Sequence, residues 1–220
     1  MVNKIKNGIV WVRTPKCATS TIAVHLQNFG EWKDINSTQS NDHGSMAPKN
    51  WINLGHLWSG DVNWDIVKQE SRGVVGSIRN PLDRFLSHYK HHLRDNRHQT
   101  HGNDVSLYYL NNHHIEHLES VFRGMDNYLC KYLGVGDDDK WDSELLKSRY
   151  DFFTVSEQLE KSLKKFEKLT GYTFENKSLT ENKTETTLIQ TDEFIELFKE
   201  RNKNDYELYD FIINHYGYAE

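Results

Sequence analysis

The sequence predicts one α/β domain with a mostly parallel central sheet flanked by helices. Short apolar segments alternate with amphipathic ones along the chain, which is the pattern of strands joined by crossover helices. The chain has 220 residues, of which 36% are hydrophobic and 12% aromatic. This length is enough for one domain with a proper core and short for two, so we expect residues 1–220 to form a single domain.

The expected elements follow in chain order. Apolar runs at 10–13, 74–79 and Phe152–Val155 predict the central strands. The helix after the second strand has the clearest pattern, because Pro81 suits its first position and Leu82, Phe85 and Leu86 recur at three- and four-residue spacing. Helices are expected at 19–29, 81–94, 105–123, 125–133, 156–170, 192–199 and 205–216, and residues 34–50, rich in Asn, Ser and Asp, predict a loop.

The loop after the first strand has the residues of an anion site. The loop contains Lys16. Three consecutive hydroxyl residues, Thr19, Ser20 and Thr21, begin the next predicted helix. A helix that begins near Ala18 directs its free N–H groups at an anion. The glycines of the common G-x-x-x-x-G-K-[ST] nucleotide loop are absent, which suggests a different phosphate donor. Helix capping alone is the alternative explanation of the hydroxyl residues.

A second strand-to-helix junction also carries a cation. Arg79 ends the second predicted strand, and Ser87 lies two turns into the following helix. Ligands of open α/β sheets lie beyond the carboxyl ends of the strands. We therefore expect Arg79 and the Lys16 loop to line one cleft, with Ser87 in reach of the same ligand.

Together these two segments resemble sulfotransferases that use 3′-phosphoadenosine 5′-phosphosulfate (PAPS), of the carbohydrate type that includes heparan sulfate 2-O-sulfotransferase. The resemblance implies a P-loop-like sulfotransferase fold and transfer of a sulfuryl group from PAPS to an acceptor hydroxyl. Residues 13–21 resemble the loop that holds the 5′-phosphosulfate, and residues 78–89 the segment that holds the 3′-phosphate. The implied cofactor-binding residues are Arg13, Lys16, Cys17, Ala18, Thr19, Ser20, Thr21, Arg79, Ser87 and Lys183.

The same resemblance assigns the catalytic residues. Lys16 is placed to stabilise the leaving oxygen, and His56, in a Gly-His pair, is the expected base for the acceptor hydroxyl. His25, His43 and His88 are the alternatives for the base. The expected acceptor is a carbohydrate, and Trp51, Trp58 and Trp64 near His56 suit stacking on sugar rings or burial in the core.

Other functions are considered beside this one. His113-x-x-Glu116-His117 matches the H-x-x-E-H pattern of inverted zinc metallopeptidases. A nucleotide-dependent phosphoryl transferase is a second alternative, weakened by the missing glycine loop and the lack of a suitable magnesium aspartate. A binding protein that keeps the PAPS site without turnover is a third.

Composition limits the partners and the compartment. The net charge of −5 gives no general attraction to nucleic acid. No apolar run is long enough to span a membrane, and the first strand starts too early for a signal peptide, so a cytoplasmic location is expected. The two cysteines, Cys17 and Cys130, are expected as reduced thiols. Arg84 is expected to pair with Asp83 or Asp95 on a helix surface.

Overall fold

A five-stranded parallel sheet organises the structure, which is a computed structural model that describes residues 9–26, 32–34, 51–53, 63–95, 107–110, 126–137, 139–170 and 187–219. The strand order is β2-β3-β1-β4-β6, and every neighbouring pair is parallel. The strands are β1 Ile9–Val12, β2 Trp32–Asp34, β3 Trp51–Asn53, β4 Gly73–Ile78 and β6 Phe152–Val155. The predicted α/β fold with a parallel sheet is confirmed, and β6 forms the end of the sheet instead of its interior.

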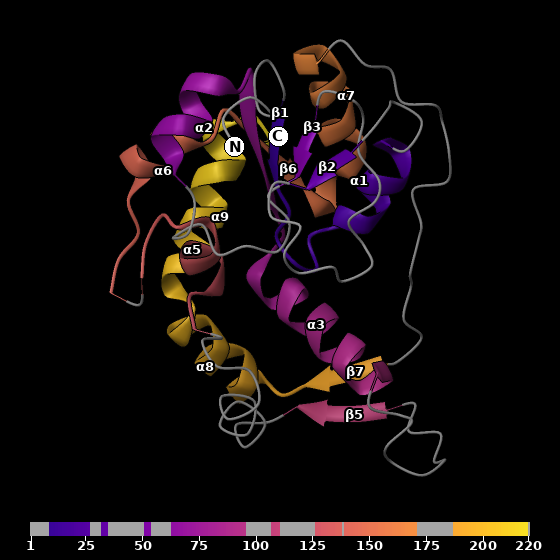
Figure 1. The fold of residues 1–220 in the computed structure, drawn as a ribbon. Helices are drawn as coiled ribbons and strands as arrows, with labels where there is room; N and C mark the ends of the chain where they lie inside the picture. The colour runs from indigo at the N-terminus through magenta and orange to yellow at the C-terminus, as the bar shows by residue number, and fades with distance from the viewer. Residues whose placement is uncertain are drawn as a thin grey trace.

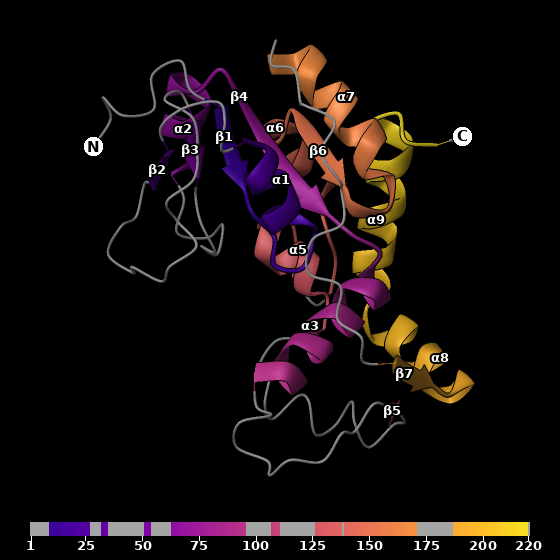
Figure 2. The same cartoon turned by 90° about the vertical axis from the view of Figure 1, so that its right-hand side faces the viewer.

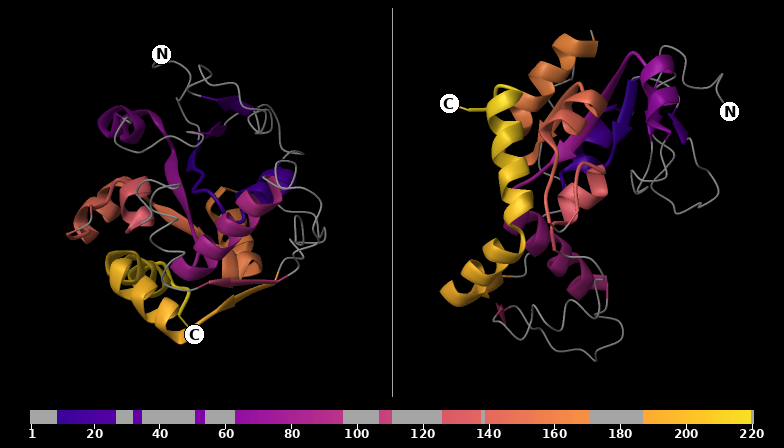
Figure 3. Two further views of the ribbon diagram at one scale, coloured as in Figure 1. Left: turned by 90° about the horizontal axis from the view of Figure 1, so that it is seen from below. Right: turned by 90° about the vertical axis from the view of Figure 1, so that its left-hand side faces the viewer.

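Helices cover both faces of this sheet (Figures 1 and 3). The helices α1 Thr19–Leu26 and α7 Leu159–Thr170 lie on one face. On the other face lie α2 Trp64–Glu70, α5 Tyr128–Leu133, α6 Ser143–Arg149 and α9 Lys203–His215. Beyond the carboxyl edge, α3 Pro81–Asp95 and α8 Asp192–Arg201 lie near a second sheet of β5 Leu107–Leu110 and β7 Thr187–Gln190 (Figure 2). A 3₁₀ turn, η5 Ser156–Gln158, joins β6 to α7.

Two of the expected helices differ in the structure. The helix expected at 105–123 is wrong over Leu107–Leu110, which pairs in parallel with Thr187–Gln190. The Leu-Tyr-Tyr-Leu sequence favours a strand. The strand forms because β7, which is distant in the sequence, pairs with it. The helix expected from residue 125 begins at Tyr128, because Asn127 adopts a left-handed backbone with φ of 47°. None of the helices among the described residues could span a membrane.

Buried hydroxyl groups connect the three strands β1, β4 and β6. The indole N–H of Trp11 donates to Ser77 Oγ at 2.8 Å, and Thr154 Oγ1 donates to the same oxygen at 2.9 Å. All three side chains are buried, so each polar group has its partner inside the sheet. These hydrogen bonds fix the lateral alignment of the strands whose carboxyl ends carry the candidate residues.

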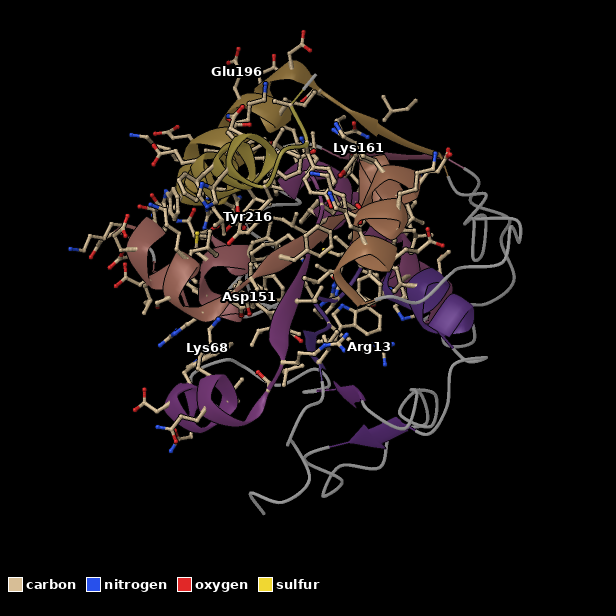
Figure 4. The ribbon with its side chains drawn as sticks, turned by 90° about the horizontal axis from the view of Figure 1, so that it is seen from above. Arg13, Lys68, Asp151, Lys161, Glu196 and Tyr216 are labelled. Atoms are coloured by element: carbon tan, nitrogen blue, oxygen red, sulfur yellow. The ribbon has the colours of Figure 1, made fainter. Side chains whose placement is uncertain are left out.

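Side-chain contacts before and along β6 hold this strand in the sheet. Asp151, just before β6, accepts from the Val74 N–H at 2.8 Å and pairs with Lys68 at 3.0 Å (Figure 4). The C-terminal segment packs on the same strand, where the Tyr218 hydroxyl donates to the Phe153 carbonyl at 2.7 Å. The order β1-β4-β6 is therefore supported by side chains as well as by the backbone ladder.

A prediction follows from the packing of Gly76 in β4. A Cβ added to Gly76 would lie 2.3 Å from the Phe153 ring, whereas one added to Gly73 would meet only Asp151 Oδ2 at 3.7 Å. We expect Gly76→Ala to lower the free energy of unfolding by about 1–3 kcal/mol, because overpacking displaces a buried ring. Gly73→Ala is the matched control and should change it by less than about 1 kcal/mol in chemical denaturation. Equal stabilities of the two variants would contradict this account.

Candidate functional site

The order of the strands places the candidate site at the carboxyl edge between β1 and β4. The chain adds β2 and β3 on one side of β1 and β4 and β6 on the other, so the direction of winding reverses between β1 and β4. Ligands of open parallel sheets bind at such a switch point. The Lys16 loop follows β1 and Arg79 follows β4, so the two predicted motifs flank it.

The Lys16 loop has the backbone of a glycine loop without glycine. The Cys17 N–H donates to the Thr14 carbonyl at 3.3 Å, which closes a turn with Pro15 and Lys16 at its centre. Lys16 has φ of 65° and Ala18 has φ of 52°, both in the left-handed region that disfavours side chains. Such strain persists only where surrounding structure enforces it, and it concentrates at ligand sites.

The loop leads directly into the N-terminus of α1. The first helical hydrogen bond runs from the Ile22 N–H to the Ala18 carbonyl at 3.1 Å. The N–H groups of Thr19, Ser20 and Thr21 come before Ile22 in the chain, in the turn where backbone N–H groups have no partner within the helix. No acidic residue stands in the first turn. The positive end of the helix therefore meets no carboxylate from its own first turn, which suits an anion. Thr19 and Thr21 are buried, and Ser20 is exposed.

Arg79 brings the second motif into contact with the first. Its Nη1 donates to the Lys16 carbonyl at 3.4 Å, and its Nε lies 3.9 Å from Glu157 Oε1. The Nε atom is buried and makes no hydrogen bond to any residue in the described part of the chain. Arg79 thus keeps a donor for a further acceptor. A ligand anion beside the Lys16 loop is the partner that this geometry suits.

Glu157 is a residue of this edge that sequence reasoning did not single out as functional. Its Oε1 accepts from the Asn80 N–H at 2.8 Å, and its Oε2 accepts from the Tyr209 hydroxyl at 3.4 Å. Burial raises the pKa of its carboxyl group, while the Asn80 N–H and the Arg79 guanidinium act in the opposite direction. Its position two residues after the third predicted strand was the available sequence signal.

Two predicted loop residues, Arg13 and Cys17, have buried side chains. Arg13 is 5% exposed, its guanidinium lies 5.4 Å from the Trp11 ring centre, and its carbonyl accepts from the Tyr132 hydroxyl. Cys17 is 1% exposed, and burial raises the pKa of its thiol to about 12. The Cys17 thiol is therefore neutral at pH 7 and shapes the loop by packing.

Arg84 contradicts the expectation of a surface ion pair with Asp83 or Asp95. It is 2% exposed, and its guanidinium lies 4.0 Å from the centre of the Tyr128 ring. Burial raises the pKa of the neighbouring Asp205, and the hydrogen bonds from the Leu129 and Cys130 N–H groups and the charge of Arg84 oppose this shift. The face of α3 that bears Arg84 packs inward, which helical periodicity alone did not reveal.

The remaining predicted residues divide into two groups. Ser87 is half-buried on α3, two turns beyond Asn80 and on the same face of the helix. Trp64 is partly buried and packs edge-on against Tyr150, with Arg149 over its ring, so it lies against the core. Other predicted residues lie outside the described part of the chain: His43, His56, Trp58, His113, Glu116, His117 and Lys183. The described part contains no cluster of His, Cys, Asp or Glu that would hold a metal ion.

Comparison with known protein families agrees with the geometry. The model of the sulfotransferase family matches residues 1–212, which include both motifs. The chain belongs to the sulfotransferase family. It is accordingly a transferase of sulfuryl groups, and sulfotransferases generally take them from PAPS. Comparison with curated proteins and with solved structures gave no significant match.

The left-handed backbone at Ala18 gives a second prediction. Ala18→Gly should leave the free energy of unfolding unchanged or raise it by up to about 1 kcal/mol, because glycine adopts a positive φ without strain. Ala18→Val should lower it by about 1–3 kcal/mol, since a β-branched residue there is a clear outlier. Thermal and chemical unfolding of the pair measure this difference, and a valine variant as stable as the glycine variant would contradict the assigned backbone.

Proposed function

We propose that the donor of this sulfotransferase is PAPS, held between the Lys16 loop and Arg79. The contact between Arg79 and the Lys16 carbonyl supports this proposal, because it joins the two cationic motifs at the switch point of the sheet. In the proposal, the residues from Lys16 to Thr21 hold the 5′-phosphosulfate, and Arg79 and Ser87 hold the 3′-phosphate. Lys183 is a further candidate contact.

The described residues fit a ligand with two separated anionic groups. One anion suits the open N-terminus of α1, whose first turn lacks a carboxylate. A second suits the buried Nε of Arg79, which has no hydrogen-bond acceptor among the described residues. ATP carries no 3′-phosphate, so a site with Arg79 in this role would prefer PAPS.

The proposed chemistry is electrostatic. Bound PAPS would supply the sulfuryl group and leave as 3′-phosphoadenosine 5′-phosphate (PAP). The Lys16 ammonium and the N–H groups at the start of α1 stabilise negative charge that gathers on the leaving oxygen. They are held by a preorganised loop, so little reorganisation is needed during transfer.

The acceptor side of the proposal rests on the sequence. His56 is the proposed base that removes the proton from the acceptor hydroxyl, because imidazole titrates near neutral pH. The proposed acceptor is a carbohydrate, as in the heparan sulfate 2-O type of sulfotransferase that the motifs resemble. Both assignments are open to direct assay.

The role of Arg79 is tested by its alanine variant. Arg79→Ala should weaken PAP binding about 10-fold to 100-fold in calorimetry, because a charge-assisted contact to the 3′-phosphate is lost. Binding of AMP, which lacks that phosphate, should change less than about twofold. Equal losses for PAP and AMP would show that Arg79 does not recognise the 3′-phosphate.

The role of His56 is tested by turnover with radiolabelled PAPS and a panel of desulfated glycans. His56→Ala should lower the transfer rate by about 100-fold, the usual contribution of a general base, and leave PAP affinity unchanged. His88→Ala is the matched control, since His88 is the alternative base on α3. Near-normal transfer by His56→Ala, or a larger loss in His88→Ala, would contradict the assignment.

A further inference from the structure

Glu157 lies beside the arginine that the proposed function assigns to the 3′-phosphate. It follows the carboxyl end of β6, where Val155 pairs with Ile78 of β4. Its Oε1 is the oxygen 3.9 Å from Arg79 Nε. A carboxylate so close to an anion-binding arginine is unfavourable for an anion, and its position therefore requires an explanation.

The contacts of Glu157 are unequal in strength. Its hydrogen bond from the Asn80 N–H is 2.8 Å long, whereas the ion pair with Arg79 is too long to be a hydrogen bond. The two side chains are 30% and 32% exposed, which limits the contribution of the pair to stability. Glu157 is thus fixed by the backbone at the start of α3, and Arg79 is held loosely and can change partner.

We propose that Glu157 is a positioning residue that serves as the exchangeable counter-ion of Arg79. In the free protein it pairs with Arg79 beside the Lys16 loop. The 3′-phosphate of the donor or of PAP takes its place, and the carboxylate, still bound to the Asn80 N–H, then repels the phosphate. The inference rests on the proposed function, and its consequence is a limit on nucleotide affinity that favours release of PAP.

Among the described residues, the charged groups with the largest effect on the Glu157 carboxyl are Arg79 and Asp83, and Asp83 adds negative charge. Tyr209 and Cys17 are neutral at pH 7, since burial raises the pKa of Tyr209 above its usual range and that of Cys17 to about 12. The ionised carboxylate therefore adds negative charge beside the proposed place of the 3′-phosphate.

The isosteric variant Glu157→Gln tests the inference. The amide oxygen can still accept from the Asn80 N–H, so the variant should fold, and thermal unfolding checks this. We expect PAP to bind about 3-fold to 10-fold more tightly in calorimetry, because the competing charge is gone. AMP affinity should change less than twofold. In the Arg79→Ala background, the added Glu157→Gln should have a smaller effect on PAP, because the arginine for which the carboxylate and the phosphate compete is absent.

The matched control is Glu160→Gln on α7. It removes the same charge from an exposed residue that pairs with Lys164 at 2.9 Å, and it should leave PAP affinity unchanged. Unchanged or weaker PAP binding by Glu157→Gln, or an equal gain in Glu160→Gln, would overturn the inference. If the wild-type protein does not prefer PAP to AMP, the proposed function itself fails. A wild-type preference without a Glu157→Gln effect rejects the counter-ion alone.

Discussion

The parallel pairing of β1 with β4 is the constraint on which the candidate site depends. Val12 lies opposite Gly76, so both strands end at the same edge and deliver the Lys16 loop and Arg79 side by side. This register needs Gly76, since a side chain there would enter the Phe153 ring. The buried hydrogen bonds that Ser77 accepts from Trp11 of β1 and Thr154 of β6 hold the same alignment. A shift of either strand along the other would separate Lys16 from Arg79, even if the sequences of both motifs were unchanged.

Electrostatics at this edge differ from those of the whole molecule. The chain carries a net charge of −5, yet the edge gathers Arg79, Lys16 and the positive end of α1. Two buried arginines, Arg13 and Arg84, lie beneath, each against an aromatic ring. Asp205 of α9, which accepts from the N–H groups of Leu129 and Cys130 at the start of α5, balances part of this charge. In the proposed function these positive groups attract the anionic donor, while the negative net charge of the chain repels polyanions overall.

The proposed phosphate loop combines a left-handed backbone with residues other than glycine. Left-handed backbone at Lys16 and Ala18 costs conformational energy, and burial of Cys17 and the turn from Thr14 enforce it. The cost is met during folding, so the N–H groups are already oriented when a ligand arrives. Lys16 in particular combines a strained backbone with a charged side chain, which glycine cannot offer.

The sequence alone determined the class of fold, the strands β1, β4 and β6, the two cationic motifs and the family. Apolar runs and the order of motifs are local signals, so they can be recognised without knowing which distant residues they contact. The tertiary structure decided the rest: the strand at Leu107–Leu110, the short strands β2 and β3, the burial of Arg84 and the partnership of Glu157 with Arg79. Each of these depends on contacts between residues far apart in the chain, which neither periodicity nor composition records.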